Sequence, residues 1–190
     1  MQSTLPAQKT RTPKRNAADT VFSRAFYKPY EAAVETALFL ICAARGRLIR
    51  ETGEDIRAMT YRLKSPASIR GKLLKKGLPV SESAARAALH DIAGLRVVLA
   101  DEKEVYHFAE LLCASPVAQL LDEKDYIATP KRSGYQSLHL LLSLPVSVQG
   151  AAMMVPVEVQ LRTAAMDIWA NIEHDMVYKP LPLEAGTDAF

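Results

Sequence analysis

The chain has 190 residues, a formal net charge of +3 and a hydrophobic content of 49%, which suit one domain with a single core and exclude a disordered or fibrous protein. Its longest apolar stretch, Val34 to Ala44, is interrupted by Glu35 and is shorter than the roughly 20 residues that cross a bilayer, so we expect no membrane-spanning helix. Only two cysteines are present, Cys42 and Cys113, and their apolar neighbours favour reduced, buried thiols over a disulfide or a zinc site.

Residues 1–21 carry four basic side chains and few large apolar ones, a composition typical of a flexible tail. The stretch up to Lys28 also lacks the compact apolar run of a secretory signal, so we expect a cytoplasmic protein. We predict a folded domain over residues 22–180 and a C-terminal tail over residues 181–190.

The first half of this domain predicts three helices. From Pro29, apolar residues recur at helical spacing as far as Thr52-Gly53, which indicates a long core helix. A second helix is expected from Pro66 to Lys76, because Ser65 can cap it, proline suits the first helical position and Gly77 follows its end. Ser81 should cap a third helix that continues through Leu89.

The second half predicts two further strands around a hairpin turn, besides a first strand from Ile92 to Leu99. We expect the following elements: helices over Glu104–Leu112 and Val117–Leu121, a turn at Lys131–Gly134, a central strand over Leu138–Val146, a hairpin turn at Gln149-Gly150, a returning strand that ends at Arg162, and a helix over Ala164–Met176 whose apolar face (Ala165, Ile168, Trp169, Ile172, Met176) closes the domain.

One short segment concentrates positive charge: six basic residues and no acidic one lie between Arg62 and Lys76. Lys64, Ser68 and Lys72 are spaced by four and would align along one side of the helix that begins at Pro66. Together with the free N–H groups of the helix start, they could bind a di- or triphosphate, and Arg62 could clamp a phosphate or stack on a base. The alternative is a basic helix face that only meets solvent.

Two acidic residues are candidates for metal binding or proton transfer. In the strand that ends at Arg162, the period of two places Glu158, Gln160 and Arg162 on one face, which either meets water or lines a cleft. In a cleft, Glu158 could hold Mg²⁺ or accept a proton, and Asp91 could share the metal. Asp91 could instead be a simple cap or turn residue ahead of Gly94.

Lys131, Tyr135 and His139 surround the turn at Gly134 and form a third group. Tyrosine in such a loop can stack on a nucleobase, and the lysine and the histidine could reach phosphates. His139 could equally be a satisfied polar group at the start of a strand. The His90-Asp91 pair lacks the second histidine–carboxylate set that a metal-dependent phosphohydrolase would need.

Five segments carry a resemblance when they are taken in order. They closely resemble the synthetase domain of RelA/SpoT-type alarmone synthetases over roughly Tyr30 to Lys179. The segments are Arg62–Ile69 (RLKSPASI), Asp91–Arg96 (DIAGLR), Asp125–Ile127 (DYI), Pro130–His139 (PKRSGYQSLH) and Glu158–Thr163 (EVQLRT), followed by Trp169-Ala170 and Glu173-His174.

This resemblance implies an α+β fold, with a mixed β-sheet flanked by helices as in nucleotidyltransferases, and the synthesis of (p)ppGpp from ATP and GDP or GTP with Mg²⁺. It implies that Arg62 and Arg96 sandwich the adenine and that Lys64, Ser68 and Lys72 bind the ATP phosphates. It implies that Asp91 binds Mg²⁺ and that Glu158 helps to place the metal and activates the acceptor 3′-hydroxyl. Tyr135 would stack on the guanine, and Lys131 and His139 would bind the phosphates of the acceptor. Gln160 and Asp167 would lie near the acceptor nucleoside.

The resemblance also leaves alternatives open. The chain has no room for the hydrolase and regulatory modules of long family members, so we expect no hydrolysis. Helices beyond the Tyr178-Lys179 position support a tetramer in many small members, whereas eleven residues follow Lys179 here, and a homo-oligomer stays open. Asp167 stands where asparagine is often expected, which leaves the base selectivity open.

Two other functions compete with free-nucleotide synthesis. Some small relatives are toxins, with an antitoxin as partner, that modify the tRNA 3′ end or make adenosine alarmones. The basic tail and the cluster around Lys75-Lys76 could contact RNA, whereas the segment Pro130–His139 looks intact and favours a free guanosine nucleotide. A catalytically inactive sensor would be expected to lack Asp91 or Glu158, and both are present.

Overall fold

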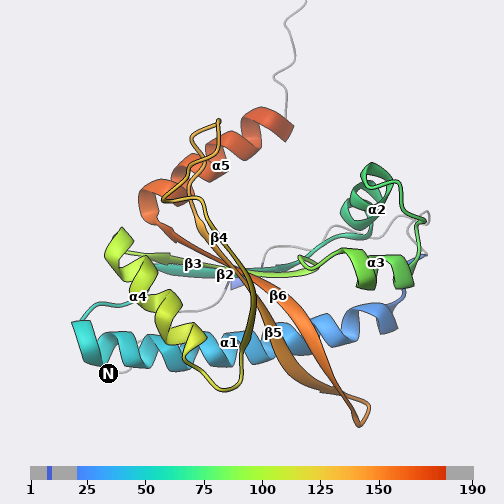
Figure 1. The fold of residues 1–190 in the computed structure, drawn as a ribbon, viewed down its shortest axis with the longest axis horizontal. Helices are drawn as coiled ribbons and strands as arrows, with labels where there is room; N and C mark the ends of the chain where they lie inside the picture. The colour runs from blue at the N-terminus through green and yellow to red at the C-terminus, as the bar shows by residue number, and fades with distance from the viewer. Residues whose placement is uncertain (1–7, 10–20, 179–190) are drawn as a thin grey trace, which may run out of the picture.

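A computed structural model describes residues 8–9 and 21–178 and contains a mixed sheet with the strand order β1-β2-β3-β6-β5-β4 (Figure 1). Only β1–β2 and β3–β6 pair in parallel; the other neighbours are antiparallel. The strands are β1 (Gln8–Lys9), β2 (Ala58–Leu63), β3 (Ala93–Leu99), β4 (Gln119–Asp125), β5 (Leu138–Val148) and β6 (Ala151–Thr163), and the helices are α1 (Arg24–Thr52), α2 (Pro66–Lys75), α3 (Glu82–Ala88), α4 (Glu102–Cys113) and α5 (Ala164–Tyr178).

This arrangement confirms the predicted α+β class with a mixed sheet flanked by helices. Most of the predicted tails, residues 1–7 and 10–20 and all of 181–190, lie outside the described residues. Within the predicted N-terminal tail, the short strand β1 pairs with β2, an element that the sequence did not indicate. In the described part of the chain, no helix combines the length and the apolarity needed to cross a membrane.

The long helix α1 begins earlier than its predicted start at Pro29. The side chain of Ser23 caps it by accepting a hydrogen bond from the N–H of Phe26, and Gly53 ends it with a φ of 79°. Pro29 therefore lies inside the helix, although it lacks the N–H that would bond to the preceding turn. Phe26 and Tyr30 on either side of Pro29 are buried, so core packing outweighs the cost of the proline.

The sheet has one apolar and one polar face because successive side chains of a strand alternate. Leu95 pairs with Val159, which in turn pairs with Leu140, and all three are buried on the side that α1 covers. In Figure 1, α1 and α4 lie below the sheet, whereas α5 and α2 stand above it. The alternate residues of the same strands therefore face the opposite side, between α2 and α5.

The caps and turns around the polar face agree with the sequence. Ser65 caps α2 and Ser81 caps α3, as predicted, through hydrogen bonds from main-chain N–H groups three residues later. Gln149 and Gly150, with φ angles of 53° and 83°, form the tight turn of the β5–β6 hairpin.

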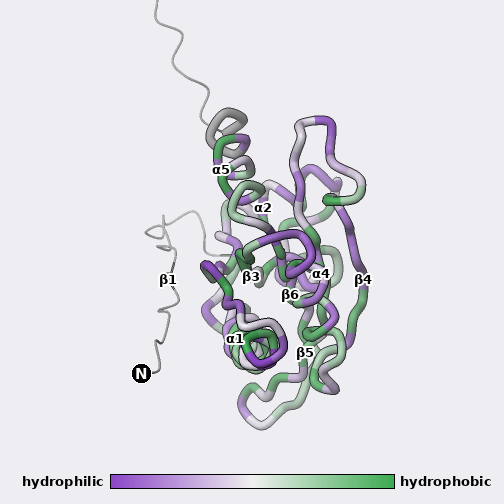
Figure 2. Tube along the Cα trace, turned by 90° about the vertical axis from the view of Figure 1, so that its left-hand side faces the viewer, coloured by the Kyte–Doolittle hydropathy of each residue, from purple (hydrophilic) through white to green (hydrophobic). Residues whose placement is uncertain are grey.

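One predicted element is wrong, and one strand is missing from the prediction. The segment Val117–Leu121 is not a helix, because residues from Gln119 on pair with β5 as the edge strand β4, with a bulge between Leu120 and Asp122. All of β4 except Asp125 is exposed, so neither face of the strand is buried and its sequence lacks the alternation of apolar and polar residues that predicts a strand. Figure 2 shows β4 at the edge of the molecule. The strand β2, which precedes α2, was not predicted either.

The orientation of α5 also differs from the prediction. Its expected apolar face does not close the core: Ile168, Trp169 and Ile172 are 62%, 49% and 47% exposed. Among residues 164–173, whose burial is described, Met166 and Ala170 are buried, because α5 contacts the sheet near its beginning and then projects away (Figure 1). The predicted face residue Met176 lies outside this described part. The cysteines are free, as expected, but Cys42 is exposed rather than buried.

Two adjacent residues of α1 test the described core. Leu48 is fully buried and Ile49 is 40% exposed. We expect Leu48→Ala to lower the free energy of unfolding by about 2–5 kcal/mol, because it removes buried methyl groups and leaves a cavity. The control Ile49→Ala should cost less than about 1 kcal/mol. Urea unfolding followed by circular dichroism measures both values, and equal losses would contradict this orientation of α1.

Candidate active site

The polar face of the sheet brings residues from three strands into register. Gly94 of β3 pairs with Glu158 of β6, and in the next row Arg96 pairs with Gln160, which pairs with His139 of β5. Directly opposed residues project on the same side of a sheet. Arg96, His139 and Gln160, from three segments far apart in sequence, therefore lie side by side, with Glu158 in the next row.

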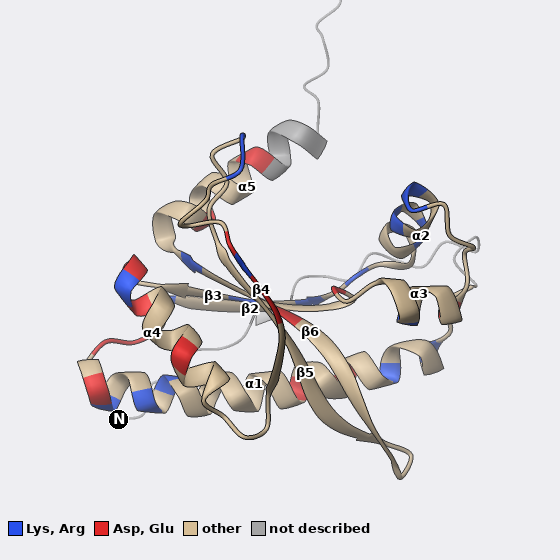
Figure 3. Ribbon diagram, viewed as in Figure 1, with Lys and Arg blue, Asp and Glu red and all other residues tan. Residues whose placement is uncertain are grey.

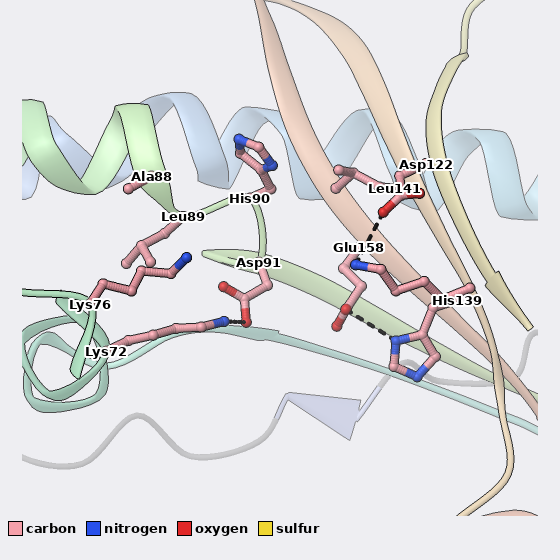
Figure 4. A pocket seen from close by; sticks show the side chains of 11 residues that line it. Lys72, Lys76, Ala88, Leu89, His90, Asp91, Asp122, His139, Leu141 and Glu158 are labelled. Carbon is pink, nitrogen blue, oxygen red and sulfur yellow. Dashed lines mark hydrogen bonds and ion pairs between the residues drawn. The ribbon is translucent and has the colours of Figure 1, made fainter. Parts of the chain in front are cut away.

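A pocket of about 230 Å³ lies where this face meets α2 and α3. Figure 4 shows Asp91 and Glu158 opposite each other in it, with the ammonium of Lys72 beside Asp91 and the imidazole of His139 beside Glu158. Figure 3 shows basic residues along α2. The lining residues are Lys72, Lys76, Ala88, Leu89, His90, Asp91, Asp122, Lys124, His139, Leu141 and Glu158.

Asp91 is held between two lysines that the sequence assigned to phosphate binding. Its Oδ2 lies 2.6 Å from Nζ of Lys72 and 3.1 Å from Nζ of Lys64. Burial raises the pKa of Asp91, but the hydrogen bond from Lys72 and the charge of Lys64 outweigh burial, so the pKa lies below its ordinary value. Asp91 is therefore ionised at neutral pH, and its buried Oδ1 has no hydrogen-bond partner.

Glu158 is a second ionised carboxylate, supported by two neighbours. His139 Nδ1 lies 3.2 Å from its Oε1, and Gln160 Nε2 donates to its Oε2 over 2.7 Å. Burial raises the pKa of Glu158, and Asp91 raises it slightly through charge repulsion, but the hydrogen bonds from His139 and Gln160 bring it below its ordinary value.

The turn at Gly134 carries the third predicted group. Lys131 Nζ lies 4.5 Å from the ring centre of Tyr126 and 4.6 Å from that of Tyr135, which is a cation–π arrangement. The hydroxyl of Tyr135 is 2.8 Å from His139 Nε2. On the outer side, the indole N–H of Trp169 donates to the carbonyl of Ser133, so α5 fastens this turn.

Arg96 and Asp167 form an ion pair at the far end of the polar face. Arg96 Nη1 lies 3.0 Å from Asp167 Oδ1, and the same oxygen accepts a hydrogen bond from Arg162 Nη1 over 3.3 Å. Burial, followed by the positive charge of Arg162, lowers the pKa of Arg96 from its ordinary value, while Asp167 opposes this shift. Asp167 thus connects Arg96, a candidate adenine contact, with Arg162 at the end of β6.

Four of the predicted residues line the pocket itself (Lys72, Asp91, His139 and Glu158), and eight do not. Six of these eight make the contacts described above (Lys64, Arg96, Lys131, Tyr135, Gln160 and Asp167); the other two are Ser68 and Arg62. Ser68 is exposed, and its hydroxyl lies 2.9 Å from that of the capping residue Ser65. Arg62 is exposed on β2 opposite Gly94, near enough to Arg96 for its charge to lower the pKa of that side chain.

Lys76, His90, Asp122 and Lys124 line the pocket but were missed in the sequence. Lys124 pairs with His139 across β4 and β5, so recognising β4 as a strand would have placed Asp122 and Lys124 on the same face. His90 was considered only together with Asp91, as a phosphohydrolase pair. Arg162 was noticed as part of a motif but received no role.

The carboxylates suit a metal ion that is bound mainly by substrate. Among the described residues, no cluster of three or more His, Cys, Asp and Glu side chains could hold a metal by itself. Mg²⁺, however, is often bound by one or two carboxylates together with phosphates and water. The buried, unpartnered Oδ1 of Asp91 and the nearby Glu158 fit this kind of site.

Comparisons with known proteins agree with this geometry. Residues 61–181 match the family model described as the region found in RelA / SpoT proteins. The GTP pyrophosphokinase YjbM of Bacillus subtilis is 37% identical over 158 residues, which cover 81% of this chain and 72% of that protein. The chain belongs to the RelA/SpoT family.

Other relatives share the same domain. The GTP pyrophosphokinase YwaC of Bacillus subtilis is 39% identical over 118 residues, which cover 62% of this chain and 56% of YwaC. The small alarmone synthetase 1 from Bacillus subtilis, bound to its product pppGpp, superposes with a TM-score of 0.74 and 35% identity, covering 82% of this chain and 80% of that one. The RelA/SpoT fold expected from the sequence is thereby confirmed.

The lysine pair around Asp91 predicts a pH-dependent contribution to stability. At pH 7, we expect Asp91→Asn to lower the free energy of unfolding by about 1–3 kcal/mol, because Lys64 is left partly buried without its counter-charge. The pKa of Asp91 in the folded protein lies below its ordinary value of 3.8. The stability difference between the two proteins should therefore have its full size above about pH 4 and disappear as the pH falls through the folded pKa.

Urea unfolding at several pH values measures this difference. The exposed pair Asp122–Lys124 provides the control, and Asp122→Asn should change stability by less than about 1 kcal/mol at any pH. An Asp91→Asn loss that persisted unchanged at pH 2–3 would contradict the ion pairs described here.

Proposed function

We propose that this protein transfers the terminal diphosphate of ATP to the 3′-hydroxyl of GDP or GTP, producing (p)ppGpp and AMP. This proposal rests mainly on the position of Asp91 and Glu158 in one pocket. Lysines lie beside Asp91, and His139 connects Glu158 to the turn that carries Lys131 and Tyr135. Its relatives named GTP pyrophosphokinase and the superposed synthetase bound to pppGpp support this function.

The half of the site around α2 suits the diphosphate donor. Lys64 and Lys72 converge on Asp91 and can move a short distance to phosphate oxygens, because lysine side chains are long and flexible. Arg96, with Arg62 nearby on β2, offers a planar cation that can stack on adenine. Ser68, in the first turn of α2, would contribute its hydroxyl near the helix start.

The half around the turn at Gly134 suits the acceptor. The ammonium of Lys131 lies against the rings of Tyr126 and Tyr135, which are tilted by 71° to each other, and a guanine base stacked on Tyr135 would take the place of this ammonium. The released lysine could then bind the 5′-phosphates together with His139. Gln160 lies directly opposite His139, and Asp167 contacts Arg162 two residues further along β6, so both would lie near the nucleoside of an acceptor bound here.

In the proposed reaction, the acceptor 3′-oxygen forms a bond to the β-phosphorus of ATP, and the bond between that phosphorus and the bridging α,β-oxygen breaks. AMP leaves with the bridging oxygen, and Glu158 accepts the proton of the 3′-hydroxyl. Asp91 and Glu158 would hold Mg²⁺, which supplies charge neutralisation of the phosphates when bound. Lys64 and Lys72 add positive charge where the diphosphate is transferred.

The deciding experiment incubates the purified protein with Mg²⁺ and ATP labelled at the γ-phosphate. GDP, GTP, AMP, ATP and deacylated tRNA are offered in separate reactions, and the products are resolved by chromatography. We expect label on GDP or GTP with release of AMP, and no reaction without Mg²⁺. Label only on tRNA or on an adenosine nucleotide would overturn the guanosine acceptor and support the toxin class, with an antitoxin as partner.

Two lysines of the same helix test the donor half. Lys72 lines the pocket, whereas Lys75 is an exposed residue of α2 outside its lining. We expect Lys72→Met to raise KM for ATP about tenfold or more, since a charge-assisted contact to phosphate is lost, and to leave KM for the acceptor unchanged. Lys75→Met should leave both values unchanged. Steady-state kinetics measures them, and a rise confined to the acceptor KM would reassign Lys72.

A further inference from the structure

Arg162 occupies a buried position from which four polar side chains can be reached. It lies on β6 two residues after Gln160, and it is only 2% exposed. A guanidinium carries five N–H donors and no acceptor, and it stays charged at all relevant pH values. Its partners are Tyr135 Oη at 2.5 Å, Gln160 Oε1 at 2.8 Å, Ser137 Oγ at 3.3 Å and Asp167 Oδ1 at 3.3 Å.

Two hydrogen-bond chains lead from Arg162 to Glu158. The first runs through the hydroxyl of Tyr135 to His139 Nε2, and from His139 Nδ1 to Glu158 Oε1. The second runs through the amide of Gln160 to Glu158 Oε2. Each oxygen of the carboxylate is therefore connected to the same guanidinium by a separate route.

The chemistry of the two ends fixes the direction of both chains. Arg162 can only donate, and the ionised carboxylate of Glu158 can only accept. A neutral imidazole between them must carry its proton on Nδ1 and accept the Tyr135 hydroxyl proton on Nε2. The Gln160 amide must likewise present its oxygen to Arg162 and its nitrogen to Glu158.

We propose that Arg162 is the positioning residue of the acceptor half of the site. It orients the Tyr135 hydroxyl, which fixes the tautomer of His139, and it orients the Gln160 amide. His139 and Gln160 then both donate hydrogen bonds to Glu158. Arg162 itself does not need to contact a nucleotide, because Tyr135, Gln160 and Asp167 lie around it. The kinetic part of this proposal rests on the proposed function, whereas the hydrogen-bond directions do not.

The kinetic test uses Arg162→Lys, which keeps the charge but loses the planar fork of donors. We expect kcat to fall about 10- to 100-fold and KM for the guanosine acceptor to rise, while KM for ATP changes less than about twofold. Glu158→Gln gives the reference for complete loss. Arg45→Lys is the matched control, because Arg45 makes a similar two-pronged contact to Asp55 away from the pocket, and its kinetics should match those of the unchanged enzyme.

A second pair of variants removes the chains and leaves Arg162 in place. Tyr135→Phe and Gln160→Leu each interrupt one chain, and their combination should lower kcat as much as Arg162→Lys does. Adding Arg162→Lys to that double variant should then have little further effect. Normal kcat in the folded double variant would overturn the proposal even where Arg162→Lys does not fold. Where Arg162→Lys does fold, fully additive losses would overturn it as well.

A readout that needs no activity is the ¹⁵N spectrum of the imidazoles in the nucleotide-free and metal-free protein, recorded at about pH 8.5, where an ordinary histidine is neutral. His139→Gln assigns the signal among the four histidines. We expect a proton on Nδ1, and a mixture of tautomers in Arg162→Lys. A proton on Nε2 in the unchanged protein would overturn the proposal, and an inactive protein with the expected tautomer would instead refute only the proposed function.

Discussion

The parallel pairing of β3 with β6 is the contact on which the site depends. It joins the strand that follows Asp91 to the strand that carries Glu158, and its register sets Gly94 beside Glu158 and Arg96 beside Gln160. The same pairing places Leu95 and Val159 on the opposite face, against the core beneath α1. Burial of one face thus fixes which side chains appear on the other, because a register slip of one residue would exchange the two faces.

The cations and acids of this face are arranged around one another even without substrate. Lys64 and Lys72 neutralise Asp91, and Asp167 lies between Arg96 and Arg162. Such pairing lowers the cost of gathering many partly buried charges in a small region. In the proposed function, phosphates and a metal ion would replace these internal partners rather than bind to isolated charges.

The sequence predicted the local elements around the site better than the edges of the fold. Helix caps at Ser65 and Ser81, the turn at Gln149-Gly150 and the alternation around Glu158 are local signals, and the structure agrees with each of them. The exposed strand β4 lacks such a signal, because both of its faces are largely solvated. The outward projection of α5 depends on tertiary contacts that helical periodicity alone does not contain.

The edge position of β4 has a consequence for the whole molecule in solution. An unpaired strand edge exposes a row of main-chain donors and acceptors to which another chain could add. In β4, the run Asp122–Asp125 consists entirely of charged residues, and the bulge after Leu120 interrupts the regular ladder. Charges and bulges are the features that discourage strand addition. The side chains of Asp122 and Lys124 that line the pocket therefore also protect the protein against edge-to-edge aggregation.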